Sequence, residues 1–326
     1  MKVLITTVPF ADKNILPLEL LEGAEAEYVI NPLNKKLSED ELSEMVSDFE
    51  IIIAGTEPIT EHVMSKATKL KMISRVGIGL DSVDLIAAEK RGIKVSYTPD
   101  APAPAVAELT IGLIITLLRS VQLSNLEMHS GEWKRYFGKR IANSTIGIIG
   151  LGRIGARILN RLKVFGTPRL LVNDISPNLE LDRSFKLEWV DKNTIYKESD
   201  IISLHLPLTK LTKNMISEKQ LKLMKSDASI INTSRGGIIN ELDLYNVMKS
   251  GHLSGAAIDV FEQEPYSGLL KELDRCLLTA HMGSMSIDCR TRMEVEATEE
   301  AVRFIKNQPL ESEVPKSEYY VQRDGL

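Results

Sequence analysis

The first hundred residues alternate short apolar runs with amphipathic stretches. Residues 38–48 and 80–91 repeat apolar positions with helical periodicity and have polar residues on the other face. Ser38 and Glu41 open the first of these with capping-box spacing. Four apolar runs have the character of buried parallel strands: residues 2–7, 49–55, 70–77 and 92–98. Strands that alternate with helices predict a parallel sheet with helices on its faces.

A second α/β series follows a proline-rich stretch. Residues 98–105 hold three prolines and predict a hinge or domain crossing. One long apolar helix is expected from about Val106 to about His129, and a last amphipathic helix at 293–307 precedes a polar tail. Six further strands are predicted: residues 145–150, 169–174, 200–207, 228–234, 254–260 and 276–281. The pattern therefore predicts two consecutive α/β units.

Composition narrows the class of protein. The chain has 326 residues, enough for one or two domains, and a net charge of −5, which gives no electrostatic footprint for nucleic acid. Two cysteines argue against a disulfide scaffold and fit a reducing cytoplasm. The N-terminus reads as a strand and not as a signal peptide. The longest apolar run, residues 105–118, is too short to span a bilayer and contains Glu108. We expect a cytoplasmic protein without nucleic-acid or membrane partners.

Gly150, Gly152 and Gly155 form a GxGxxG motif between an apolar strand and a helix. In this context the first glycine permits a tight turn, the second lets the backbone approach a pyrophosphate, and the third lets the helix pack closely. The N–H groups and dipole at the helix start favour phosphate charge, and Arg153 adds charge at the rim. The motif predicts a dinucleotide site.

Asp174 ends the next strand, roughly 20 residues after the glycines. A carboxylate there hydrogen-bonds a ribose 2′-hydroxyl and repels a 2′-phosphate. Only Ile175 and Ser176 follow it directly, without an arginine. This favours NAD over NADP. The alternative, a glycine turn beside a surface aspartate, requires strand, helix, spacing and acid to coincide by chance.

Hydride transfer from a nicotinamide requires a proton donor and acceptor for the substrate oxygen, and histidine is the usual choice. His62, His129 and His252 lie in or at the end of helical segments, where a structural role is the simpler interpretation. His205 ends a strand and suits the lining of the cofactor cleft. His281 ends an apolar strand before a Gly-Ser turn and is the strongest candidate.

Arg235 and Glu264 each follow another predicted strand. Arg235 offers planar, two-pronged recognition of a carboxylate, and the two glycines after it leave the backbone open. Ligands of open α/β sheets sit at the carboxyl ends of strands, so Arg235, Glu264 and His281 are expected to converge. A carboxylate beside an imidazole fixes its tautomer and raises its pKa. Spacing alone leaves open whether Glu264 is an ordinary loop carboxylate.

These residues lie in motifs that resemble those of the D-isomer-specific 2-hydroxyacid dehydrogenases. The resemblance covers nearly the whole chain and rests on seven motifs in order: SRVGIGLDSVDL, VAELTIGLII, GIIGLGRIG, LHLPLT, NTSRGGIINE, GAAIDVFEQEP and TAHMGS. It implies two Rossmann-like, doubly wound parallel-sheet domains with the active site between them. An NAD-binding domain at 102–286 would be inserted into a discontinuous substrate domain at 1–101 and 287–326. Members commonly dimerise through the cofactor domains, so a homodimer is expected.

The resemblance also implies residue roles. Arg235 would bind the substrate carboxylate, His281 would be the general acid in reduction and the general base in oxidation, and Glu264 would hold His281. On the substrate side, backbone N–H groups around Val76 and Gly77 would also bind the carboxylate. Seven positions would contact NAD: Arg153 and Ile154 at the pyrophosphate, Asp174 at the adenosine ribose, His205 and Pro207 near the adenosine, and Thr233 and Asp259 at the nicotinamide carboxamide. No metal is implied.

Some positions bear on the substrate. Arg75 matches a position where phosphoglycerate dehydrogenases have a basic residue near the substrate, whereas Asp100 is unfavourable to a doubly charged one. Ala280 precedes His281 where many relatives have proline. The nearest subgroup resembles phosphoglycerate dehydrogenase, with 3-phosphoglycerate or glyoxylate and hydroxypyruvate as candidate substrates.

Two alternatives stay open from the sequence. One is an NAD-sensing, corepressor-like binding protein. The other is a related dehydrogenase of an unusual substrate such as phosphite. Formate-type relatives have glutamine where Glu264 stands, which argues against formate.

Overall fold

The computed structural model describes residues 1–166 and 168–324, and the chain forms two compact units. Unit 1 comprises Met1–Pro102 and Met285–Leu326, and unit 2 comprises Ala103–Ser284. Unit 2 is thus inserted in the sequence of unit 1. The boundaries at 102/103 and 284/285 lie beside those expected at 101/102 and 286/287. The last two positions of the expected substrate domain, 325 and 326, lie outside the described residues.

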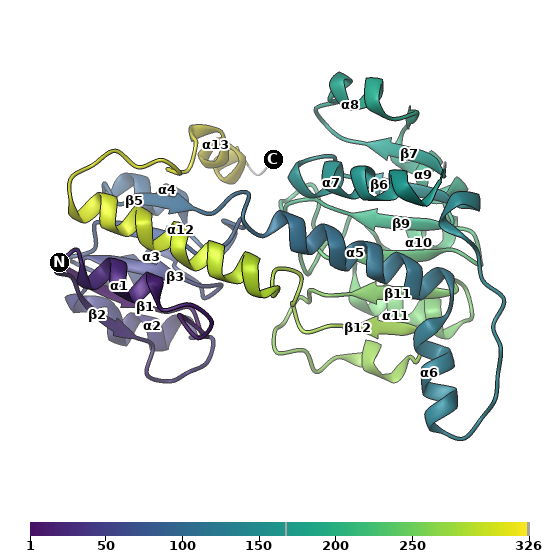
Figure 1. The fold of residues 1–326 in the computed structure, drawn as a ribbon, viewed down its shortest axis with the longest axis horizontal. Coiled ribbons are helices and arrows are strands. Elements are labelled where there is room, and N and C mark those ends of the chain that lie inside the picture. The colour runs from purple at the N-terminus through teal and green to yellow at the C-terminus, as the bar shows by residue number, and fades with distance from the viewer. Residues whose placement is uncertain (167, 325–326) are drawn as a thin grey trace. The chain divides into compact units, whose positions relative to one another are not determined.

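Unit 1 contains a five-stranded parallel sheet in the order β2-β1-β3-β4-β5. Its strands are β1 (Lys2–Ile5), β2 (Glu27–Ile30), β3 (Ile51–Ala54), β4 (Met72–Arg75) and β5 (Lys94–Tyr97). Its helices are α1 (Leu16–Glu22), α2 (Glu39–Met45), α3 (Glu61–Lys66), α4 (Leu85–Lys90), α12 (Ile287–Ile305) and α13 (Lys316–Asp324) (Figure 1).

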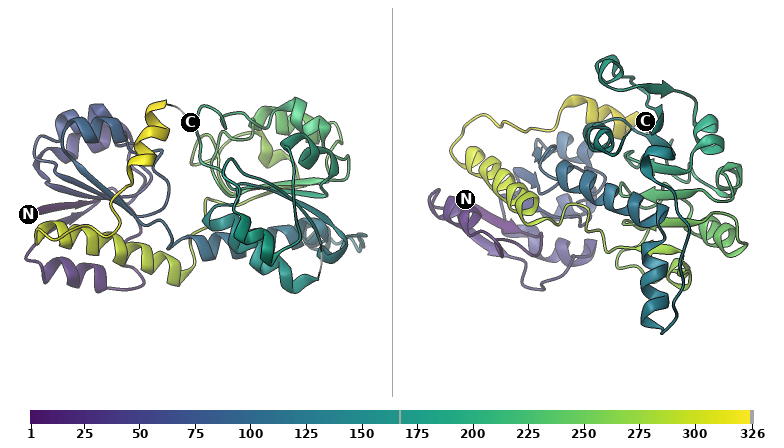
Figure 2. Two further views of the ribbon diagram at one scale, coloured as in Figure 1. Left: turned by 90° about the horizontal axis from the view of Figure 1, so that it is seen from above. Right: turned by 45° about the vertical axis from the view of Figure 1, so that its right-hand side comes forward.

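Alternate strand residues of unit 1 point to two separate cores. Leu4 and Ile52 pack with residues from α2, α3 and α4, whereas Val3 and Ile53 pack with α1 and α12 on the other face. Figure 2 shows α1 and α12 together on one side of this sheet. The predicted capping box at Ser38 starts α2, since the Ser38 and Glu41 side chains each accept the other's backbone N–H.

Unit 2 contains a seven-stranded parallel sheet in the order β12-β11-β10-β9-β6-β7-β8. Its strands are β6 (Thr145–Ile149), β7 (Arg169–Asn173), β8 (Leu187–Trp189), β9 (Ile201–Leu204), β10 (Ser229–Asn232), β11 (Gly255–Ile258) and β12 (Cys276–Leu278). Its helices are α5 (Ala103–Leu118), α6 (Val121–His129), α7 (Arg153–Leu162), α8 (Leu179–Ser184), α9 (Lys192–Glu198), α10 (Glu218–Leu223) and α11 (Glu241–Lys249). The strand order reverses between β6 and β9, which is the switch point where doubly wound sheets bind ligands.

Helices cover both faces of this sheet. Residues of α5 and α7 pack on one face with Ile148, Val172 and Ile231, and residues of α9, α10 and α11 pack on the other with Ile202 and Ile230. Continuous apolar strands are typical of parallel sheets that are covered on both faces. The predicted α/β class with two doubly wound units is confirmed.

The expected single helix at 106–129 is wrong. The chain breaks after α5, Ser120 has a left-handed φ of 51°, and α6 continues at a bend of 65°. A non-glycine residue in this conformation cannot continue a right-handed helix. No single helix within the described ranges is long and apolar enough to cross a membrane, and α5 and α6 pass that test only as a bent pair.

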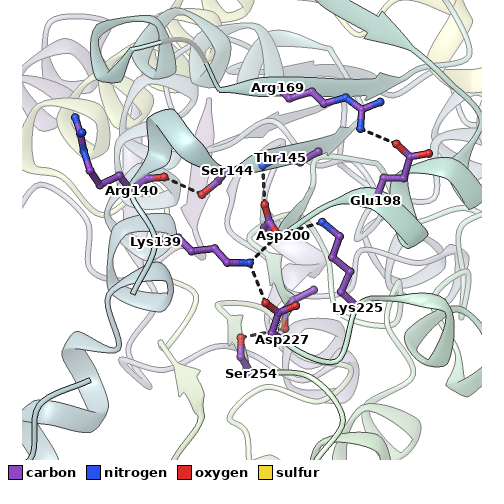
Figure 3. A network of polar contacts seen from close by, with 11 residues as sticks. Lys139, Arg140, Ser144, Thr145, Arg169, Glu198, Asp200, Lys225, Asp227 and Ser254 are labelled. Atoms are coloured by element: carbon purple, nitrogen blue, oxygen red, sulfur yellow. Dashed lines mark hydrogen bonds and ion pairs between the residues drawn. The ribbon is translucent and has the colours of Figure 1, made fainter. Parts of the chain in front are cut away.

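A polar cluster lies at the amino-terminal edge of the seven-stranded sheet (Figure 3). Asp200 accepts hydrogen bonds from Thr145 N at 2.7 Å, Lys139 Nζ at 2.9 Å and Lys225 Nζ at 3.1 Å. Lys139 also pairs with Asp227 at 2.9 Å. Burial by itself raises the pKa of Asp200, but these donors outweigh it and lower the pKa below its usual value. The cluster ties the segment after α6 to the starts of three strands.

Candidate active site

Three neighbouring strands of unit 2 end at the expected catalytic residues. β10, β11 and β12 are adjacent and parallel, so their carboxyl ends lie at one edge of the sheet. Arg235 follows β10, Glu264 follows β11, and His281 follows β12. The fold therefore brings the three loops to one edge, as the pattern of strand ends predicts.

His281 and Glu264 form a direct pair. His281 Nδ1 lies 2.9 Å from Glu264 Oε2 and 3.1 Å from Oε1. Because a carboxylate only accepts, Nδ1 carries a proton and Nε2 is the ring nitrogen that exchanges one. The His281 side chain is 36% exposed and that of Glu264 is 21% exposed. A partly exposed imidazole with a fixed tautomer is suited to general acid and base catalysis.

Asp259 anchors the loop that carries His281. Its carboxylate accepts hydrogen bonds from Thr279 Oγ1 at 2.6 Å, Met282 N at 2.9 Å and Gly283 N at 2.9 Å. Its backbone carbonyl accepts the N–H of His281 at 2.8 Å, and His281 has a left-handed φ of 48°. Asp259 is fully buried, and burial raises its pKa although these hydrogen bonds act in the opposite sense. The carboxylate that the resemblance assigns to the nicotinamide is thus engaged by the catalytic loop.

The Arg235 turn is braced by Asn232, a residue that sequence reasoning did not single out. Asn232 Oδ1 accepts from Ser234 N at 3.1 Å and Oγ at 2.8 Å, and its Nδ2 donates to Arg235 O at 2.8 Å. Asparagine at a strand end commonly makes such turns, and this was the available signal. Arg235 itself is half-buried and donates from Nη1 to Ser234 O at 2.6 Å.

Gly236 explains why the arginine is followed by glycine. A Cβ at this position would lie 2.0 Å from Phe261 C and O and 2.6 Å from Glu262 N. Those atoms belong to the loop that leads to Glu264. Only glycine lets the Arg235 turn approach that loop so closely.

The backbone geometry of the glycine motif suits the binding of a pyrophosphate. Gly150 has φ of 97°, and a Cβ there would lie 2.2 Å from His205 O. A Cβ on Gly155 would lie 2.2 Å from Gly150 O, so this glycine permits the close packing of α7. Gly152 precedes α7 with open space around it and no side-chain cap, so the first N–H groups of the helix face no capping side chain. Arg153 is exposed and Ile154 half-buried at this helix start. Uncapped N–H groups with the helix dipole suit an anionic ligand.

Asp174 and His205 flank the glycine turn. Asp174 accepts from Leu151 N at 2.6 Å and from Ser176 N at 2.8 Å, and it stays partly exposed. His205 Nε2 lies 2.8 Å from Ser203 Oγ. Its Nδ1 is buried and has no hydrogen-bond partner among the described residues, and burial lowers the pKa of His205 to about 3. An unpaired buried polar atom beside the turn is consistent with a ligand that supplies the missing partner.

Two remaining cofactor positions differ in exposure. Pro207 is exposed, and its carbonyl accepts from Thr212 Oγ1 at 2.6 Å. Thr233 is buried, with its hydroxyl 3.2 Å from that of Thr110 in α5. The described residues of unit 2 therefore include a turn, a helix start, an acid and an unpaired imidazole nitrogen that fit a dinucleotide.

The loop of unit 1 that is expected to bind substrate uses its first N–H groups in hydrogen bonds within the unit. Val76 N donates to Ala54 O at 2.9 Å, and Gly77 N donates to Thr98 Oγ1 at 2.8 Å. Arg75 is only 5% exposed and donates from Nη1 to Val76 O. A Cβ on Gly77 would lie 2.8 Å from Arg75 Nη1. The Arg75 guanidinium therefore packs against the backbone of its own loop.

Comparison with known proteins agrees with this arrangement. Residues 111–283 match the family described as D-isomer specific 2-hydroxyacid dehydrogenase, NAD binding domain. The chain is 37% identical over 284 residues to D-3-phosphoglycerate dehydrogenase of Methanocaldococcus jannaschii, covering 85% of this chain and 54% of that one. It is 35% identical over 273 residues to hydroxypyruvate reductase of Thermotoga maritima, covering 82% and 88%. The structure superimposes on a glyoxylate reductase from Paecilomyes thermophila with a TM-score of 0.85 at 27% identity, covering 97% and 99%.

The chain belongs to the family of D-isomer-specific 2-hydroxyacid dehydrogenases. This places it among NAD-dependent oxidoreductases and confirms the family, the enzyme class and the cofactor NAD that the sequence predicted. The chain spans about half the length of the matched phosphoglycerate dehydrogenase.

Proposed function

We propose that the protein interconverts a small 2-oxo acid and the corresponding D-2-hydroxy acid with NAD. The observation that carries this proposal is the contact between His281 and Glu264. These two residues follow two of three adjacent strands, and Arg235 follows the third. The pair supplies an oriented proton donor, and the arginine supplies a carboxylate partner. Bound NAD supplies or accepts the hydride.

His281 is the proposed general acid of reduction and general base of oxidation. Its Nε2 donates a proton to the oxygen at substrate C2 during reduction and takes it back in the reverse direction. Glu264 keeps the proton on Nδ1 and stabilises the imidazolium. Asp259 acts here through the backbone of the His281 loop. Asp259 stays the proposed partner of the nicotinamide carboxamide, and its side chain also anchors the His281 loop.

Arg235 is the proposed partner of the substrate carboxylate. Its guanidinium can form two parallel hydrogen bonds that align the 2-oxo group and stabilise charge that develops on its oxygen. The N–H groups around Val76 and Gly77 stay further proposed partners of the carboxylate, although those of Val76 and Gly77 themselves donate within unit 1.

For NAD, the proposed contacts lie around the glycine motif. Gly150, Gly152 and Gly155 shape the turn, and the N–H groups of Arg153 and Ile154 would hold the pyrophosphate. Asp174, which is partly exposed, would bind the adenosine ribose hydroxyls. His205, Pro207 and Thr233 are the remaining proposed contacts.

We propose glyoxylate or hydroxypyruvate as the substrate class, in preference to 3-phosphohydroxypyruvate. A second anionic group needs a cation that can reach it. Arg75, the basic residue expected to serve a phosphate, is buried under Val76 and Gly77 and donates to its own loop. It supports the shape of its own loop.

The test is NADH oxidation with glyoxylate, hydroxypyruvate, pyruvate and 3-phosphohydroxypyruvate. Wild type is compared with Arg235→Lys, Arg75→Gln and an exposed control, His62→Gln on α3. We expect turnover of the two small acids, a loss of about 100-fold or more in kcat/KM for Arg235→Lys, and no effect of the control. Preference for the phosphorylated acid, lost selectively in Arg75→Gln, would overturn the substrate class. NADH binding without turnover of any acid would overturn the dehydrogenase proposal and favour the sensor.

We also propose a homodimer formed through unit 2. No residue of α6 is buried, and α6 projects from the rest of unit 2 in Figure 1. Large exposed apolar side chains gather on α6 and the segment after it: Val121, Leu126, Met128, Trp133 and Phe137. A patch of this kind is typical of a protein interface.

A further inference from the structure

Glu241 links α11 to the loop that carries Glu264. It is the first residue of α11 and lies half-buried. Its Oε1 accepts the backbone N–H of Glu262 at 2.7 Å. This is a charge-assisted hydrogen bond from a carboxylate to a backbone donor, a strong type of contact. The start of α11 therefore holds the segment after β11 two residues before Glu264.

The same segment is fixed by two further contacts. Phe261 N donates to Glu264 Oε1 at 3.2 Å, so Glu264 folds back onto its own loop while both of its carboxylate oxygens lie near His281 Nδ1. Gly236 packs against the backbone of Phe261 and Glu262. With Glu241 removed, the N–H of Glu262 loses its acceptor and the loop loses one of three restraints.

The carboxylate of Glu241 also acts electrostatically on this loop. Burial raises the pKa of Glu241, and the charges of Glu262 and Glu264 add to the rise, although the Glu262 N–H opposes it. The interaction is mutual, so an ionised Glu241 places negative charge near Glu264. A cavity of about 310 Å³ lies beside Glu241 and Glu262.

We infer that Glu241 is a positioning residue for the proposed catalytic acid: its hydrogen bond to Glu262 N fixes the loop that aims Glu264. This inference rests on the proposed role of His281. Glu241 acts on the reaction only through Glu264.

The experiment compares Glu241→Gln with Glu241→Ala. Glutamine keeps an oxygen that accepts from Glu262 N but removes the charge, whereas alanine removes both. We expect Glu241→Gln to keep kcat within about twofold of wild type, because the acceptor for Glu262 N remains. Glu241→Ala is expected to lower kcat by about tenfold while the KM for NADH stays unchanged. An equal loss in both variants, or a wild-type kcat in Glu241→Ala, would overturn the inference. Glu218→Gln is the matched control, since Glu218 is likewise the first residue of a helix but pairs with Lys222 at the surface.

Hydrogen exchange at the amide of Glu262, followed by NMR, provides a readout without turnover. Faster exchange of this amide in Glu241→Ala, with Glu241→Gln close to wild type, supports the inference even if no tested acid turns over, which would overturn only the proposed function. Unchanged exchange in Glu241→Ala, or equally fast exchange in Glu218→Gln, would overturn the inference. If Glu241→Ala fails to fold, Glu241→Asp, whose carboxylate is one methylene shorter, takes its place.

Discussion

At the scale of single residues, two sets of contacts orient His281, one to its imidazole ring and one to the backbone around it. Glu264 binds Nδ1, while Asp259 binds the backbone N–H groups around the histidine. The resemblance predicted the first contact. The second could not be predicted, because the strand-end pattern places Asp259 near the site without showing whether its carboxylate faces a ligand or its own loop.

Glu264→Gln tests the ring contact. The amide still accepts from Nδ1 but no longer stabilises a positive imidazole. We expect kcat/KM for reduction to drop about 10- to 100-fold near pH 7. Steady-state kinetics check this. A rate close to that of wild type would show that the charge of Glu264 is not needed.

At the scale of elements, the site exists because three adjacent parallel strands end at one edge. The strand pattern predicted β10, β11 and β12, but it missed β2 and β8, which are edge strands with alternating exposure. Short half-exposed strands lack the continuous apolar run that identified the others. The break between α5 and α6 was missed because it depends on the backbone of Ser120, not on a proline or glycine.

Gly236→Ala tests the approach of two site loops. A methyl group at Gly236 would overlap the carbonyl of Phe261, so the Arg235 turn must move away from the loop of Glu264. We expect a loss of kcat/KM of about 100-fold with NAD affinity largely retained. Gly112→Ala is the control, because its added methyl meets open space within α5. Wild-type kinetics in Gly236→Ala would show that the close approach is not needed.

The cluster around Asp200 predicts a pH-dependent contribution to stability. The folded-state pKa of Asp200 is lowered, so its contribution is present above the pKa of an unfolded aspartate, about 3.9, and is lost as pH falls through the folded-state pKa. Asp200→Asn should lower the free energy of unfolding by about 1.5 to 3 kcal/mol at pH 7. The difference from wild type should shrink below pH 4. Urea unfolding at several pH values measures it, with exposed Asp227→Asn as a control expected to change little.

At the scale of the whole molecule, two separate α/β units share one chain, and unit 1 is completed by α12 and α13. Hydrophobic periodicity predicted the second α/β series but not that the chain returns to unit 1 after it, because an amphipathic helix is compatible with either unit. The family resemblance predicted that one domain is inserted into the other. The tail also carries α13 and buries Tyr319 in the unit 1 core, although its composition reads as polar.

Trp133→Ser with Phe137→Ser tests the proposed dimer. These side chains are 79% and 106% exposed, so their replacement should leave the fold of unit 2 intact while removing apolar area from the interface. Light scattering with size-exclusion chromatography should give a mass of two chains for wild type and one for the double variant. Val164→Ser, at an exposed apolar residue after α7, is the control. A wild type that is monomeric at micromolar concentration would contradict the dimer.

The central claim is that His281 delivers the proton in reduction of a small 2-oxo acid to its D-2-hydroxy acid. The most direct measurement is a single-turnover reaction of NADH with hydroxypyruvate, read by loss of NADH and by chiral analysis of the glycerate formed. We predict D-glycerate from wild type and a rate about 10²- to 10⁴-fold lower in His281→Asn with NADH binding unchanged. L-glycerate, or a His281→Asn rate close to that of wild type, would contradict the account.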